Sequence, residues 1–183
     1  MNTRLMAIDT ILDFLNDRNQ NTLLIKGYDN NEKLRDVLYC LGIYFDKGTI
    51  RTSSMSDISF QINRAFNLSL LPGTLKSTTT YKLGRMKVNF RSTTSFTESK
   101  IRECEDTFTL FFPIQFETED KRSFQDLCNI VQKSNSSKKI LITTELWSRK
   151  KWDIENYVDR VLYYCDENNN LQVLSNHKKI GVK

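Results

Sequence analysis

The chain has little of several residue types on which common functions depend. Its 183 residues include six glycines, two prolines and a single histidine, His177. With so little glycine and proline, long flexible linkers are not expected. His177 lies in a basic tail that we expect to fray, which leaves no basis for a Ser–His–Asp or Cys–His catalytic arrangement.

Long apolar runs are also missing. No stretch of about 18 apolar residues is present, so the sequence predicts no membrane-spanning helix and no membrane partner. Asp9 and Asp13 interrupt the apolar part of the N-terminus, which argues against a secretory signal. We therefore expect a cytoplasmic protein.

The cysteine pattern gives no sign of a metal site. Four cysteines are present and none forms a C-x-x-C pair: Cys40, Cys104, Cys128 and Cys165. Structural zinc needs closely spaced soft ligands, which this spacing does not supply. In a protein without a secretory signal, the cysteines are expected to be reduced and buried.

The charge distribution is more informative than the net charge of +5. Residues 74–102 contain seven basic residues against one acidic residue, and residues 103–126 reverse this balance. Thr, Ser, Tyr, Val and Phe alternate imperfectly through residues 74–96, as in strands, with a turn at Gly84–Arg85. The sequence predicts a basic β-rich insertion over 74–103, whose candidate nucleic-acid contacts are Lys82, Arg85, Lys87 and Arg91.

The remaining sequence predicts one α/β domain over residues 1–183. Hydrophobic residues make up 39% of the chain, which is enough for a core. Helices are predicted over residues 4–17, 32–41, 57–67, 121–134 and 147–158, and strands over 22–26, 43–45, 49–52, 108–114 and 139–144. A C-terminal β-hairpin is predicted over 160–165 and 171–174. Strand–helix alternation of this kind favours a mostly parallel sheet covered on both faces.

Three residues mark predicted helix ends. Gly42 is expected to stop the helix that begins at 32. Ser56 is expected to cap the helix over 57–67, and Asp120 is expected to cap the helix over 121–134.

The most informative stretch is residues 21–41, NTLLIKGYDNNEKLRDVLYCL. An apolar strand leads into a polar turn, and then into a helix whose apolar residues recur with helical spacing. The phosphate-loop pattern G-x-x-x-x-G-K-[ST] fits it in part. Gly27 takes the first glycine and Lys33 the lysine, whereas Glu32 replaces the second glycine and Leu34 the Ser/Thr.

This stretch resembles a P-loop NTPase of the RecA, AAA and ABC-like kind whose phosphate loop has decayed. The resemblance covers residues 22–42 and 106–175. Residues 108–114 are similar to the strand that ends in a magnesium-supporting acid, and residues 139–144, followed by Glu145, to the sensor strand. It implies a P-loop-like sheet and a nucleotide site at Gly27 and Lys33.

The residues that would perform magnesium chemistry are missing from this resemblance. Glu32 would repel a phosphate, and Leu34 cannot hold Mg²⁺ as a hydroxyl does. The acid after the apolar strand is replaced by Pro113 or Gln115, with Glu117 as a substitute if the strand runs longer. Losing both magnesium supports argues against Mg-ATP hydrolysis.

Each loop residue also has a structural interpretation. Lys33 is either a phosphate or nucleic-acid contact, or a solvated lysine on the first turn of a surface helix. Gly27 is either part of a ligand site or a residue required by a left-handed turn.

The sequence therefore predicts a catalytically impaired P-loop-like module that binds or regulates a protein complex, nucleic acid or both. No cofactor is expected. Two alternatives stay open: an NTPase or kinase that binds ATP or GTP through Lys33 and Glu117, and a nucleic-acid-binding protein without a nucleotide site. A homo-oligomer is compatible with the sequence. Frequent Asn, Lys and Ile are associated with AT-rich bacterial, phage or plasmid genomes.

Overall fold

A computed structural model describes residues 3–95, 101–114, 120–143 and 154–164. The helical elements are α1 (Thr3–Asn16), α2 (Asn30–Tyr44), α3 (Ile58–Phe66), α4 (Lys121–Lys133) and the 3₁₀ turn η1 (Ile154–Tyr157). The strands are β1 (Thr22–Lys26), β2 (Lys47–Thr52), β3 (Thr80–Leu83), β4 (Met86–Ser92), β5 (Phe108–Phe111), β6 (Lys138–Thr143) and β7 (Arg160–Tyr163).

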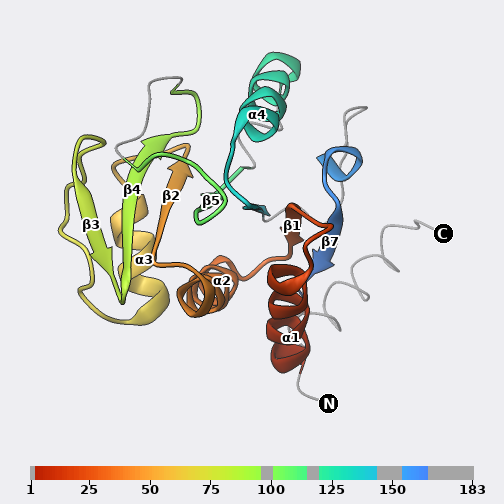
Figure 1. Ribbon diagram of the computed structural model, residues 1–183. Helices are drawn as coiled ribbons and strands as arrows, with labels where there is room; N and C mark the ends of the chain where they lie inside the picture. Colours follow the sequence, from red (N-terminus) through yellow and green to blue (C-terminus); the bar gives the residue numbers. More distant parts are fainter. Residues whose placement is uncertain (1–2, 96–100, 115–119, 144–153, 165–183) are drawn as a thin grey trace, which may run out of the picture.

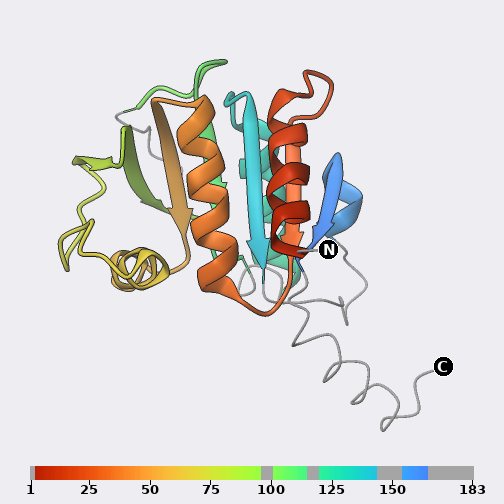
Figure 2. The ribbon, with the colours of Figure 1, turned by 90° about the horizontal axis from the view of Figure 1, so that it is seen from below.

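The strands of the described residues form a single seven-stranded sheet in the order β3-β4-β2-β5-β6-β1-β7. Neighbouring strands are parallel throughout, except for the antiparallel pair β3–β4. In Figures 1 and 2, α1 and α2 lie on one face of the sheet and α4 lies on the other. The expected fold class, an α/β protein with a mostly parallel sheet flanked by helices, is confirmed.

Two hydrophobic clusters hold the layers together. On one face, buried residues of α1, α2 and α3 pack against strand residues such as Leu23, Ile25 and Val88. On the opposite face, Leu24 and neighbouring strand residues pack against α4. Successive strand residues point to opposite faces, so burial on both faces explains why β1 is apolar throughout.

One predicted helix cap is confirmed and another is wrong. The Asp120 cap is confirmed, because its Oδ1 accepts hydrogen bonds from the main-chain N–H groups of Arg122 and Ser123 at 2.9 and 3.0 Å. The Ser56 cap is wrong: Asp57 occupies the N-cap position of α3, without a side-chain capping bond. The Ser56 hydroxyl is instead within hydrogen-bond distance of the side chains of Ser54 and Asp57.

The predicted stop at Gly42 and the strand over 43–45 are also wrong. Helix α2 continues to Tyr44, and the N–H of Phe45 closes it by donating to the Leu41 carbonyl at 2.9 Å. The Phe45 ring then packs edge-on against Phe108 of β5, with 5.6 Å between ring centroids. Tertiary packing of this turn therefore overrides the local glycine signal.

The strands of the basic segment complete one end of the central sheet. β4 pairs in parallel with β2, and β3 forms the edge strand. The predicted turn is present at Gly84, whose φ of +61° favours glycine. At the other end, β7 pairs in parallel with β1. The expected second hairpin strand (171–174) and most of the helix over 147–158 lie outside the described residues.

Across the described part of the chain, no helix combines the length and apolar character that crossing a membrane requires.

Candidate functional site

The loop between β1 and α2 lies at the carboxyl ends of the parallel strands. Ligands of open α/β sheets commonly bind at this edge. A cavity of about 570 Å³ opens here, lined by side chains of the loop and α3 together with Phe112. The partial phosphate-loop match therefore falls at the position where the fold class would place a ligand.

Lys33 is fully buried, with 0% of its surface exposed. Its ammonium donates to the main-chain oxygen of Gly27, after β1, and to that of Thr143, at the end of β6, the latter at 2.6 Å. Burial lowers the pKa of Lys33 to about 7, against a smaller opposing effect of the Asp29 carboxylate. The interpretation of Lys33 as a solvated surface lysine is wrong, because the side chain joins two strand ends inside the protein.

Two main-chain segments approach each other closely at Gly27, and this approach requires glycine. Its φ of +149° is a conformation that other residues rarely adopt. A Cβ at this position would lie 2.2 Å from the main-chain oxygen of Tyr164. The N–H of Tyr164 donates to the Lys26 carbonyl at 2.7 Å, which fixes that approach. The local constraint at Gly27 is therefore the contact between β1 and the end of β7.

The first turn of α2 is capped by an acidic side chain. Asp29 Oδ1 accepts a hydrogen bond from the N–H of Glu32 at 2.8 Å, and the Asp29 carbonyl accepts one from the N–H of Lys33 at 3.2 Å. Phosphate loops present free N–H groups and a lysine at this point. Here Asp29 takes the place of an anion, so the arrangement is a poor fit for a phosphate group.

The cavity itself carries more negative than positive charge. Among its lining side chains, Asp29 and Asp57 are acidic and Arg64 is basic. Tyr28 and Phe60 also line it and are 54% and 66% exposed. An open cavity of this composition does not favour a polyphosphate, since the two carboxylates would repel it.

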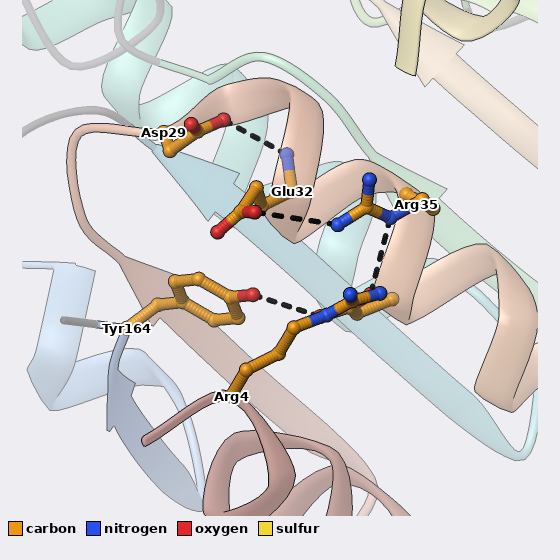
Figure 3. A network of polar contacts seen from close by, with 6 residues as sticks. Arg4, Asp29, Glu32, Arg35 and Tyr164 are labelled. Atoms are coloured by element: carbon orange, nitrogen blue, oxygen red, sulfur yellow. Dashed lines mark hydrogen bonds and ion pairs between the residues drawn. The ribbon is translucent and has the colours of Figure 1, made fainter. Parts of the chain in front are cut away.

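A buried ionic network lies immediately behind this loop (Figure 3). The carboxylate of Asp36, 1% exposed, accepts hydrogen bonds from Arg4 of α1 at 2.6 and 2.9 Å and from the Tyr164 hydroxyl at 2.7 Å. Burial raises the pKa of Asp36, but the hydrogen bonds from Arg4 and Tyr164 outweigh it and lower the pKa overall. The network ties α1, α2 and the end of β7 together, so we assign it a structural role.

The basic strands place three exposed lysines side by side. Lys87 of β4 is the register partner of Lys82 in β3 and of Lys47 in β2. All three side chains are exposed, and the other residues of β2 and β4 are mostly buried. We call Lys47, Lys82 and Lys87 the lysine row.

The other two candidate nucleic-acid contacts differ from the lysine row. Arg85 is exposed in the β3–β4 turn, where its side chain donates to the Ile43 carbonyl and lies 3.8 Å from Asp46. Arg91 is 3% exposed, and its nearest register partner in β2 is Arg51, which is 8% exposed. Both buried arginines lie beside Glu103 and Ser95, so we assign them a structural role inside the protein.

Sequence reasoning missed Lys47 as a member of this surface. It lies 40 residues from Lys87, outside the basic segment, in a turn-like Asp-Lys-Gly sequence. The one local signal is a lysine at the start of a short strand. Its place beside Lys87 follows only from the register between β2 and β4. Glu117 and Glu145, the other residues of the P-loop comparison, lie outside the described residues.

Within the ranges that the structure describes, no group of three His, Cys, Asp or Glu side chains is arranged to hold a metal ion. No protein-family model matches the sequence, and no curated protein is significantly similar to it.

Proposed function

We propose that this protein is a catalytically impaired binding or regulatory module on a P-loop-like core, and that it engages a protein complex, nucleic acid or both. The observation that carries the proposal is the position of Lys33. Its ammonium bonds to two main-chain oxygens at the ends of β1 and β6. A lysine held in this way stabilises the sheet edge on which a nucleotide would otherwise bind.

The neighbouring residues support the same conclusion. Leu34, at the position of the magnesium-binding hydroxyl, is 0% exposed and belongs to the core. Pro113 is the second residue after β5, where P-loop NTPases are expected to have a magnesium-supporting acid. Phosphoryl transfer depends on the metal and on close positioning of the phosphate. The described residues supply neither of the two side chains that would hold the magnesium ion.

The acidic character of the loop is a further argument. Asp29, Glu32 and Asp57 lie at or near the first turns of α2 and α3, and Asp29 already occupies the helix cap. A nucleotide phosphate would have to displace that carboxylate and overcome its repulsion. We infer that the loop stabilises the fold and does not bind an anion.

The test is thermal unfolding with ATP, GTP and ADP, each with and without Mg²⁺, alongside an assay of phosphate release. A ligand at one hundred times its Kd stabilises a protein by about 2.7 kcal/mol, so binding would be visible as a raised Tm. We expect no shift and no turnover. A Mg²⁺-dependent shift in the wild-type protein, with phosphate release, would instead establish an NTPase or kinase and overturn the proposal.

Lys33→Met provides the matched comparison for that test. The variant removes the ammonium and keeps a long apolar side chain in the buried position. We expect wild type and variant to respond equally to nucleotide, whatever their difference in basal Tm. A nucleotide shift that the variant loses would identify Lys33 as a phosphate ligand.

A further inference from the structure

We propose that the lysine row of Lys47, Lys82 and Lys87 binds the phosphate backbone of double-stranded nucleic acid without reading its sequence. The inference rests on the proposed function as a binding module and names its partner.

The three lysines share one face of the sheet. Lys87 is the direct partner of both Lys82 and Lys47. Directly opposed residues of an antiparallel pair, such as Lys82 and Lys87, have Cβ atoms about 4.5–5.5 Å apart, and neighbouring strands such as β2 and β4 lie about 4.7–4.9 Å apart. Because side chains alternate along a strand, buried Val88 and Met86 point to the opposite face, where they join the cluster packed against α1–α3. The lysines are therefore on the face away from these helices, in a line across β3, β4 and β2.

Such a row is unfavourable for the isolated protein. Like charges directly opposite each other in a sheet are destabilising. A lysine on an edge strand can prevent strand-to-strand aggregation, which would account for Lys82 on β3. Lys87 and Lys47 lie on β4 and β2, which are paired on both sides, so edge protection does not explain them.

The charges around the row leave it basic. Asp46, the acidic residue next to Lys47 in the chain, lies 3.8 Å from Arg85, whose side chain also donates to the Ile43 carbonyl of α2. Lysine ammonium groups act as point charges that suit phosphate oxygens. An array of cations on neighbouring strands matches a polyanion that carries a charge every few ångströms, such as a nucleic-acid duplex.

The described residues around the row favour backbone contact over base stacking. Single-stranded sites usually stack bases on exposed aromatic side chains. Tyr81, the aromatic residue beside Lys82, is the partner of Val88 and lies on the opposite face, against Phe90. Within the three described strands that carry the row, no exposed aromatic side chain lies on its face, which predicts sequence-independent and strongly salt-dependent binding.

The experiment measures fluorescence anisotropy of a short labelled duplex, as DNA and as RNA, across a range of salt concentrations. Three proteins are compared: wild type, Lys47→Gln/Lys82→Gln/Lys87→Gln, and the control Lys121→Gln/Arg122→Gln/Lys133→Gln. The control removes the same charge from exposed positions of α4. Far-UV circular dichroism and Tm establish that each variant is folded.

We expect wild type and control to bind with a slope of log affinity against log salt of about −2.7, or roughly a 40-fold loss between about 50 and 200 mM salt. The row variant should lose most of its affinity and most of that slope, and a triple Lys→Arg variant should keep both. Equal binding by all variants, no binding by wild type, or preference for anionic lipid vesicles over the duplex would overturn the inference. None of these results would bear on the nucleotide test above.

Discussion

Lys33 Nζ lies 2.6 Å from the main-chain oxygen of Thr143, a residue 110 positions further along the chain. A side chain of α2 thereby joins the carboxyl ends of β1 and β6, which are neighbours in the sheet. In phosphate-binding loops the lysine at the equivalent position reaches for the ligand. Here the Lys33 ammonium binds main-chain oxygens of the protein itself.

Lys33 should make the stability of the protein depend on pH. Burial lowers its pKa from 10.5 to about 7, so between these values the unfolded chain binds more protons than the folded protein. Folding stability should therefore rise with pH from about 7 to 10, relative to Lys33→Met, by up to about 1.4 kcal/mol per pH unit. Urea unfolding of both proteins at several pH values measures this difference, and a difference that stays constant with pH would contradict it.

Asp36 should be among the most important polar residues for stability. Asp36→Asn removes the charge that pairs with Arg4 and should cost about 1–3 kcal/mol. Tyr164→Phe removes only one hydrogen bond and should cost about 1 kcal/mol. Asp9→Asn, at an exposed position of the same region, is the control and should change stability little.

The acid dependence of the same residue gives an independent check. The pKa of Asp36 is lowered in the folded protein, so its contribution is present above its unfolded pKa and is lost as the pH falls through the folded value. The difference in unfolding free energy between wild type and Asp36→Asn should thus shrink in acid. A difference that is unchanged between neutral and strongly acidic pH would contradict this assignment.

Two glycines should respond differently to alanine. Both have positive φ, but a Cβ on Gly27 would meet the Tyr164 oxygen at 2.2 Å, whereas nothing lies within 4 Å of a Cβ on Gly84. Gly84→Ala should therefore cost only about 1–2 kcal/mol of backbone strain. Gly27→Ala should cost clearly more or prevent folding, as judged by Tm and by expression in the soluble fraction.

Gly73→Ala is the neutral control for this pair, because a Cβ there also meets nothing within 4 Å and its φ is ordinary. Equal losses for Gly27→Ala and Gly84→Ala would mean that the contact with Tyr164 is not as tight as the structure has it.

The lysine row should reduce stability in the absence of a partner. Lys87 faces a lysine on each side, so Lys87→Gln should raise the free energy of unfolding by about 0.2–1 kcal/mol. The gain should shrink as salt screens the charges. Lys133→Gln, in the last turn of α4, should give no gain because its cation favours the helix end. A destabilised Lys87→Gln variant would mean that the side chain packs in a way that offsets the repulsion.

Local patterns in the sequence were enough to predict the class of fold and most of its elements. Apolar residues with helical spacing define α1 and α4, continuous apolar runs define β1 and β6, and Asp120 marks a helix start by bonding to residues two and three positions away. These signals are local: each depends on neighbours in the chain, whose geometry any folded context preserves. The turn at Gly84 was predictable for the same reason.

The roles of the candidate residues depend on contacts between segments that are distant in the sequence. The pattern around Lys33 is the same whether its ammonium reaches a ligand or the Thr143 carbonyl, and the choice depends on β6 lying next to β1. Arg91 and Lys87 are four residues apart in one strand, yet one is covered by its surroundings and the other is exposed. Lys47 joins Lys82 and Lys87 solely through strand register, because pairing between distant segments is set by packing of the whole sheet and leaves no local mark in the sequence.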